Sequence, residues 1–263
     1  MKKDSIAIMF CALSLAIASC VSSNRAPENK VVADAMTSLK EELPIQLEGL
    51  GKVHDVDYDD NNVIFRMRIK EDASYGLSVS KISNNQALAK EIVSAQIGMM
   101  DEKAKEAIKS IAGQSFGLKV LIGCSSSSRD GVINLSSEDL KAALANAKKK
   151  SADDFSLEMV AMTTRLILPA KVDQVTTWTD TRLTESTFEY VYRIDDGNID
   201  LSNIDMETLK QEKLTMLSQN MDVMGNVVKC CKSTRRSLIY KYIGNNTQKN
   251  IEVVLMPMDL DNV

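Results

Sequence analysis

The feature that most constrains the fold is a sequence pattern that occurs twice, because a chain that repeats itself is expected to build one architecture twice. Four pairs of segments match, the first two pairs at an offset of 125 residues, the third at 121 and the fourth at 120: Leu43-Pro44 and Leu168-Pro169, 63–69 and 188–194, Leu121-Ile122-Gly123 and Tyr242-Ile243-Gly244, Asp139-Leu140 and Asp259-Leu260. The sequence therefore predicts two repeat domains, at residues 35–150 and 151–263.

The second copy predicts the order of elements in one unit. A short helix over 156–165 comes first, followed by a loosely alternating stretch and then a strand over Thr187–Ile194 with period two. Asp205 is placed to cap a long helix that runs to about Lys229. Segments 238–243 and 251–255 then form a hairpin across the turn at Gly244.

The first copy predicts the same order. Strands are expected near 47–56 and 63–70, a long helix from 84 to 111, and a hairpin from 118–122 to 132–135. Ser137 is expected to cap an extra helix that runs to about 149. We therefore predict an α+β fold made of two tandem helix-β-β-long helix-β-β units. Because short turns join neighbouring strands, each sheet is expected to be antiparallel, with the long helix packed on one face.

The N-terminus predicts export. A basic start precedes an apolar run over 6–17, which spans only about 18 Å as a helix. Because that is too short to cross a bilayer, residues 1–19 are predicted to be a cleaved signal peptide and 20–34 a flexible tether. Ile17-Ala18-Ser19-Cys20 resembles the bacterial lipobox, in which the cysteine carries the lipid; the alternative is an ordinary secretory signal. Val21 follows in place of an aspartate, which resembles sorting to the periplasmic face of the outer membrane.

Charge and cysteine content limit the partners. Net charge is -4, from 32 basic and 36 acidic residues that are mixed along the chain, so a nucleic-acid partner is not expected. One histidine and no CxxC pair predict neither a metal site nor a cofactor. After cleavage, Cys124, Cys230 and Cys231 leave two alternatives open: a disulfide from Cys124 to one of the other two, or three thiols.

The second copy also resembles a domain of small exported bacterial proteins to which no activity is assigned. The residues that carry the resemblance cover nearly all of this copy: Leu168-Pro169, Val172-Asp173, Thr176, Tyr190-Val191-Tyr192, Cys230 or Cys231, and Tyr240-Lys241-Tyr242 before Gly244. In the first copy, Phe65 and Met67 replace one pair of tyrosines, and Lys119 and Leu121 replace the other. Such domains often hold a second cysteine near the C-terminus, which this chain lacks. The resemblance implies no activity.

Catalytic patterns are weak. The segment 113–117 reads Gly-Gln-Ser-Phe-Gly and fits the serine nucleophile elbow, but a helix is expected to enter it and a strand to leave it, which reverses the required order. His54 lies among the acids of segment 55–60, in a stretch expected to be exposed. No catalytic residue is predicted from either pattern, and the acids do not follow the spacing of a calcium loop.

Four tyrosines are the candidate binding residues. Tyr190 and Tyr192 share one strand face, as do Tyr240 and Tyr242, so pairing of the two strands would bring four phenols together. The alternative is cross-strand packing beneath the helix, which we favour. Asp173 and Thr176 are the polar residues expected beside any groove there, and they complete the candidate set.

These features favour a non-catalytic, membrane-anchored envelope lipoprotein whose tandem domains bind a protein or another envelope component. The alternative is a hydrolase of an envelope polymer that uses carboxylates such as Asp173 or the acids of segment 55–60. A third possibility is a structural spacer. A pocket that holds two acids would favour the enzyme, and a spacer would have no groove.

Overall fold

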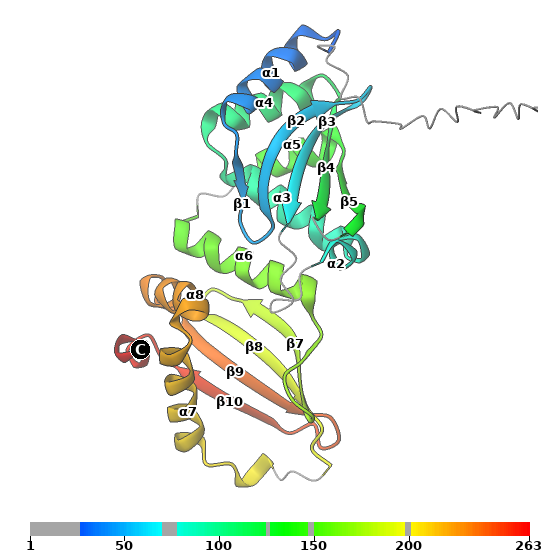
Figure 1. The fold of residues 1–263 in the computed structure, drawn as a ribbon. Coiled ribbons are helices and arrows are strands. Elements are labelled where there is room, and N and C mark those ends of the chain that lie inside the picture. Colours follow the sequence, from blue (N-terminus) through cyan, green and yellow to red (C-terminus); the bar gives the residue numbers. More distant parts are fainter. Residues whose placement is uncertain (1–26, 70–77, 125–126, 147–149, 198–200) are drawn as a thin grey trace, which may run out of the picture.

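The computed structural model describes residues 27–69, 78–124, 127–146, 150–197 and 201–263. The predicted signal peptide and Cys20 lie outside the described residues. The described part contains eight α-helices and two five-stranded sheets, which confirms the α+β class (Figure 1). Within it, no helix combines the length and apolar character that a membrane span requires.

The first sheet has the strand order β1-β2-β3-β4-β5, so spatial order follows the sequence. Its strands are β1 (Ile45–Leu47), β2 (Gly51–Tyr58), β3 (Asn62–Ile69), β4 (Gly117–Cys124) and β5 (Ser127–Leu135). Neighbouring strands are antiparallel except for β3 and β4, which are parallel.

Five helices accompany this sheet: α1 (Lys30–Glu41), α2 (Val79–Asn84), α3 (Gln86–Met99), α4 (Glu102–Gly113) and α5 (Ser137–Ala145). Each supplies apolar side chains to one hydrophobic core, in which Leu39, Ile97 and Ile108 join Phe65 of β3. α5 contacts α3 and α4, whereas α2 packs on the edge strand β5.

The second sheet has the same strand order, with β6 (Ala170–Lys171), β7 (Thr176–Leu183), β8 (Thr187–Ile194), β9 (Ser237–Gly244) and β10 (Asn250–Leu255). Here β8 and β9 are the parallel pair. Along the chain, β8 and β9 are separated by α7 (Met206–Gln219) and α8 (Met221–Ser233). The short helix η1 (Leu201–Asn203) precedes α7, and the short helix η2 (Asp259–Asn262) follows β10. The predicted strand over Thr187–Ile194 is confirmed as β8.

The prediction of fully antiparallel sheets is wrong for one strand pair in each sheet. The short hairpins are antiparallel as predicted. Between β3 and β4, and between β8 and β9, the chain crosses over through helices, and such a crossover returns the next strand in the same direction.

Each predicted long helix is divided into two. Asp101 is extended between α3 and α4, and its side chain accepts a hydrogen bond from the backbone N–H of Ala104, starting a new helix. Asn220 has a non-helical conformation between α7 and α8. The predicted cap Asp205 is confirmed, whereas Ser136 caps α5 in place of the expected Ser137.

The observed register corrects one sequence match. Tyr190 lies opposite Tyr240, and in the first sheet Phe65 lies opposite Val120. Val120 and Ile122 therefore occupy the places of Tyr240 and Tyr242, not Lys119 and Leu121 as the offset of 121 implied. A shift of one residue moves a strand's side chains to the other face, so this match assigned two half-buried residues, Lys119 and Leu121, to core positions.

α6 (Ala152–Ile167) is shared by both cores. Met159 and Met162 belong to the first core, whereas Leu157 and Ala161 belong to the second. The β1–β2 turn approaches α6 so closely that a Cβ on Gly49, at φ +72°, would lie 2.5 Å from Thr163 Cγ2. α6 therefore fixes the two sheets to each other.

α1 begins within the segment that was expected to be tether. The Asn29 side chain accepts hydrogen bonds from the backbone N–H groups of Val31 and Val32 and so starts the helix at Lys30. Val32 is fully buried in the first core. Residues 30–34 are thus part of the folded domain, and the tether prediction is wrong for them.

Candidate functional site

The four candidate tyrosines lie together in the second sheet. Tyr190 is opposite Tyr240 and Tyr192 is opposite Tyr242, with ring centroids 5.5 and 5.1 Å apart. Trp178 extends the cluster: its ring meets Tyr190 edge-on, with centroids 5.3 Å apart, and stacks on Tyr192 at 6.2 Å. Tyr190, Tyr240 and Tyr242 are buried and Tyr192 is half-buried, so the rings form part of the second core.

A lysine from α7 covers this aromatic cluster. The ammonium of Lys213 lies 5.3 Å from the ring centroid of Tyr240 and 5.5 Å from that of Tyr242. Burial lowers the pKa of Lys213 and raises the pKa of Tyr240. Lys213 therefore lies over the rings of Tyr240 and Tyr242, the two buried tyrosines of β9.

Asp173 lies in the turn between β6 and β7, and Thr176 is the first residue of β7. Asp173 Oδ1 accepts hydrogen bonds from the backbone N–H groups of Val175 and Thr176, at 2.8 and 2.7 Å. These bonds lower the pKa of Asp173. In this position the carboxylate stabilises a turn and faces solvent.

The acids near His54 are engaged in ion pairs. Arg66 Nη2 lies 3.1 Å from Asp57 Oδ2, its Nε lies 3.7 Å from Asp55 Oδ2, and Lys119 pairs with Asp59. Within the described ranges, no group of three or more histidine, cysteine or acidic residues is placed to hold a metal ion.

The serine motif is a connection between a helix and a strand. α4 enters it and β4 leaves it, as predicted, with Ser115 exposed at φ +63°. A Cβ on Gly117 would lie 2.6 Å from the carbonyl oxygen of Leu135, so close strand packing requires this glycine. The motif therefore has a structural explanation.

Cys230 and Cys231 are both free and buried, which agrees with the alternative of thiols rather than with a disulfide to Cys124. Burial raises the pKa of the Cys230 thiol to about 11 and that of Cys231 to about 12. Both thiols belong to the second core, and the side chain of Cys124 lies outside the described residues.

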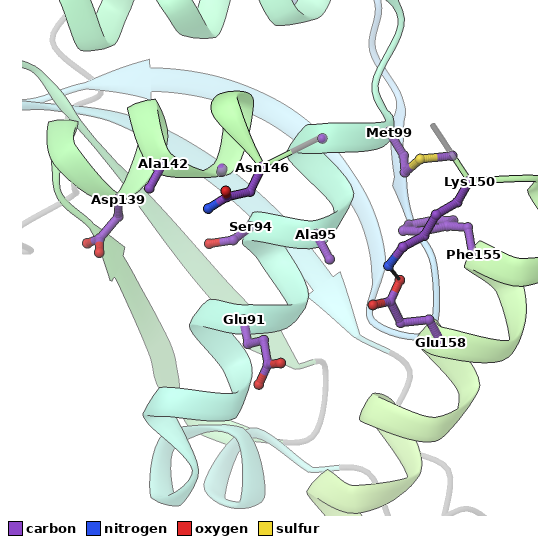
Figure 2. A pocket seen from close by; sticks show the side chains of 12 residues that line it. Glu91, Ser94, Ala95, Met99, Asp139, Ala142, Asn146, Lys150, Phe155 and Glu158 are labelled. Atoms are coloured by element: carbon purple, nitrogen blue, oxygen red, sulfur yellow. Dashed lines mark hydrogen bonds and ion pairs between the residues drawn. The ribbon is translucent and has the colours of Figure 1, made fainter. Parts of the chain in front are cut away.

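The candidate site is a groove where α3, α5 and α6 meet (Figure 2). Its volume of about 470 Å³ lies within the usual range for ligand sites. Two hollows, of about 610 and 500 Å³, are larger, but the first is lined by α7 alone and the second by α4 and α5 of the first domain only. The groove is lined by residues of all three helices and of the segment before α6: Glu91, Ser94, Ala95, Gly98 and Met99; Asp139, Ala142, Ala143 and Asn146; Lys150, Phe155 and Glu158. We therefore take the groove as the candidate site.

The rim of the groove is charged. Lys150 pairs with Glu158, and Lys90 Nζ, from outside the groove, lies 2.9 Å from Asp139 Oδ2. The hydrogen bond from Lys90 lowers the pKa of Asp139. Asp139 also belongs to the capping box of α5, where the backbone N–H of Ser136 donates to it at 2.7 Å. These contacts hold two of the rim carboxylates in place.

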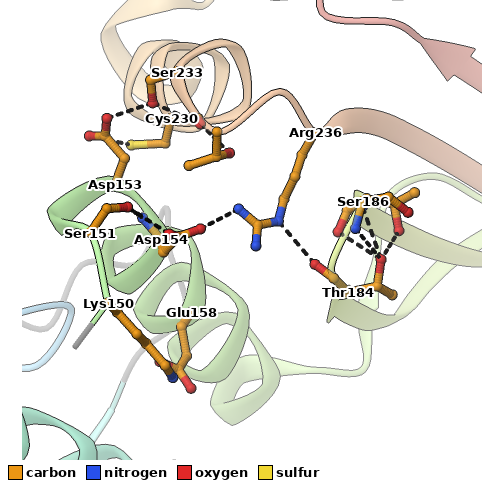
Figure 3. A network of polar contacts seen from close by, with 12 residues as sticks. Lys150, Ser151, Asp153, Asp154, Glu158, Thr184, Ser186, Cys230, Ser233 and Arg236 are labelled. Carbon is orange, nitrogen blue, oxygen red and sulfur yellow. Dashed lines mark hydrogen bonds and ion pairs between the residues drawn. The ribbon is translucent and has the colours of Figure 1, made fainter. Parts of the chain in front are cut away.

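A polar network fixes α6, and with it one wall of the groove (Figure 3). Asp154 pairs with Arg236, whose Nε donates to the carbonyl oxygen of Thr184 at 3.0 Å. Ser233 Oγ donates to Asp153 Oδ2 at 2.5 Å. The first turn of α6 is thus tied to the end of α8 and to the β7–β8 turn.

Sequence reasoning missed this groove because its residues come from distant segments. Glu91, Asp139 and Glu158 share no motif, and only the position of α6 brings the third acid to the other two. Comparisons with known protein families, with curated proteins and with solved structures find no significant match. The chemistry of the groove therefore has to be argued from its geometry.

Proposed function

We propose that the chain is a lipid-anchored envelope protein that binds a partner protein through the α3–α5–α6 groove and catalyses no reaction. The observation that carries this proposal is the groove itself, which joins an apolar floor to a charged rim at the junction of the two sheets. Such a combination is typical of recognition sites.

A carboxylate-dependent hydrolase of an envelope polymer is the second candidate, because three acids share the rim of the groove. A glycosidase needs one carboxyl group whose pKa is raised, so that it can donate a proton. Of the rim acids, Asp139 has its pKa lowered by the hydrogen bond from Lys90, and Glu158 is paired with Lys150, so neither is placed as a proton donor. Binding is therefore the function that the groove supports best.

The two-domain organisation belongs to the same proposal: residues 35–150 and 151–263 are copies of one ancestral unit. Identical strand order in both sheets supports it. So do the register shifts at Val53/Asp55 and Trp178/Asp180, which lie 125 residues apart. Ser115 and Arg235, at φ +63° and +54°, occupy matching turns 120 residues apart. In this account α6 belongs to the second copy and forms one wall of the groove. The other walls, α3 and α5, belong to the first copy.

Lipidation at Cys20 would hold α1 near a bilayer, which we propose to be the periplasmic face of the outer membrane. An extended chain from Cys20 to Asn29 spans at most about 30 Å, so α1 would stay within that distance of the membrane. Fractionation of a Cys20→Ala variant tests this part. The variant should appear in the soluble fraction, and continued sedimentation with membranes would contradict lipid anchoring.

Binding is tested by photo-crosslinking in cells. A photoreactive phenylalanine analogue at Ser94, which lines the groove, should give a discrete crosslinked species. Ser110 is a matched control, because it is also a half-exposed helical serine but lies outside the groove. Equal adduct patterns from both positions, or no adduct from Ser94, would contradict the proposal.

A further inference from the structure

Within the described residues, the groove gathers acids from three helices, and the cations beside these acids are Lys150 and Lys90. Glu91, Asp139 and Glu158 come from α3, α5 and α6 (Figure 2). Among the described lining residues, Lys150 is the only cation. Lys90 neutralises Asp139 from outside, and Glu91 has no ion pair within the described part of the chain. Counted over the described side chains, the three carboxylates exceed the two lysines that pair with them by one, which leaves room for a further positive charge.

The helix ends add to this preference. The Lys90–Asp139 ion pair joins the first halves of α3 and α5, whereas Met99 and Asn146 line the groove at their carboxyl ends. The two helices thus run in the same direction and end near α6. The carboxyl end of a helix carries roughly half a negative elementary charge and favours a nearby cation.

The floor of the groove suits an aliphatic chain. Ala95, Gly98, Ala142 and Ala143 are small, so a chain can lie close to the two helices, and Met99 and Phe155 add apolar surface at the α6 end. The ammonium group of Lys150 already pairs with Glu158 beside this apolar surface. Lys150 therefore shows, within the chain itself, that a long basic side chain can bind here.

We propose that the groove receives a lysine or arginine side chain of the partner protein. The aliphatic stem lies against Met99 and Phe155, and the charged end lies at Glu158 and the helix ends, as long basic side chains commonly arrange themselves. This inference rests on the proposed function, because it names the chemistry of the partner at the same groove.

The test compares three six-carbon probes that differ in charge: n-hexylamine, hexan-1-ol and hexanoate. Binding is followed by NMR through the methionine methyl groups, with Met99 assigned from a Met99→Leu spectrum. We expect hexylamine to shift the Met99 signal at lower concentration than either other probe. Glu158→Gln should weaken hexylamine binding roughly two- to fivefold, as expected for one partly exposed ion pair. Glu185→Gln, in the exposed β7–β8 turn, should not change it.

The Lys150→Met variant tests whether the groove prefers a cationic or an anionic ligand. Removal of this lysine frees Glu158, so hexylamine should bind roughly two- to fivefold more tightly. Preferential binding of hexanoate, or loss of binding in Lys150→Met, would overturn the inference. If Ser94 gives a crosslink but the three probes bind equally, the proposed function stands and the cationic preference fails. If hexylamine binds as expected but no partner is crosslinked, the cationic preference stands and the proposed function fails.

Discussion

Replacement of Tyr240 by phenylalanine should stabilise the protein. The Tyr240 hydroxyl is buried and has no hydrogen-bond partner among the described residues, and the residue is 2% exposed. An unsatisfied buried hydroxyl costs about 1–3 kcal/mol, and Tyr240→Phe removes this cost while it keeps the ring stack. We expect a gain of at least about 1 kcal/mol, which corresponds to a rise of about 2–4 °C in the melting temperature.

The assay is urea unfolding followed by the fluorescence of Trp178, which is the only tryptophan in the chain and stacks within the same cluster. Tyr190→Phe is the control, because the Tyr190 hydroxyl donates to the sulfur of Met224 at 3.9 Å. Loss of that weak bond should cost no more than about 0.5 kcal/mol. A Tyr240→Phe variant that is less stable than the wild type would refute the reasoning, because the hydroxyl would then have a partner in solution.

Three further predictions follow from burial and charge. Leu157→Ala and Met159→Ala should each lower the free energy of unfolding, measured in urea, by about 2–5 kcal/mol. If Leu157→Ala left the unfolding transition of the first sheet unchanged, α6 would not couple the two cores. Hydrogen bonds from Thr247 help to hold the pKa of Asp196 at about 2, so the carboxylate should stabilise the fold above pH ~4 and lose this effect as the pH falls toward 2. Asp196→Asn should flatten that part of the plot of stability against pH, and an unchanged plot would contradict this prediction. The Cys230 thiol, with its pKa raised to about 11, should react with a thiol reagent at pH ~8 only after unfolding.

Local patterns in the sequence predicted local structure well. The period-two strand at Thr187–Ile194 and the cap at Asp205 have the predicted positions, because both depend on neighbouring residues only. The break at Asn220 was missed, because the apolar stripe continues from α7 into α8 and conceals the change of direction. The parallel pairing of β8 and β9 was missed because hairpin turns at both sides suggested an antiparallel sheet throughout.

The site was harder to predict than the fold. The pairing of the tyrosine strands was anticipated, but whether their rings face solvent depends on α7, whose Lys213 lies over two of them. The groove depends on how α6 packs between the two cores, which is a tertiary property that no local motif encodes. Phe155 and Glu158 each look like an ordinary helical residue until α6 is placed beside α3.

The central claim is that the groove binds a partner through its acidic rim, and the most direct test is the yield of the Ser94 photo-crosslink in three backgrounds. The wild-type chain should give an intermediate yield, Glu158→Gln a lower yield and Lys150→Met a higher one. A yield from Ser94 that does not change across these backgrounds and equals that from Ser110 would contradict the account.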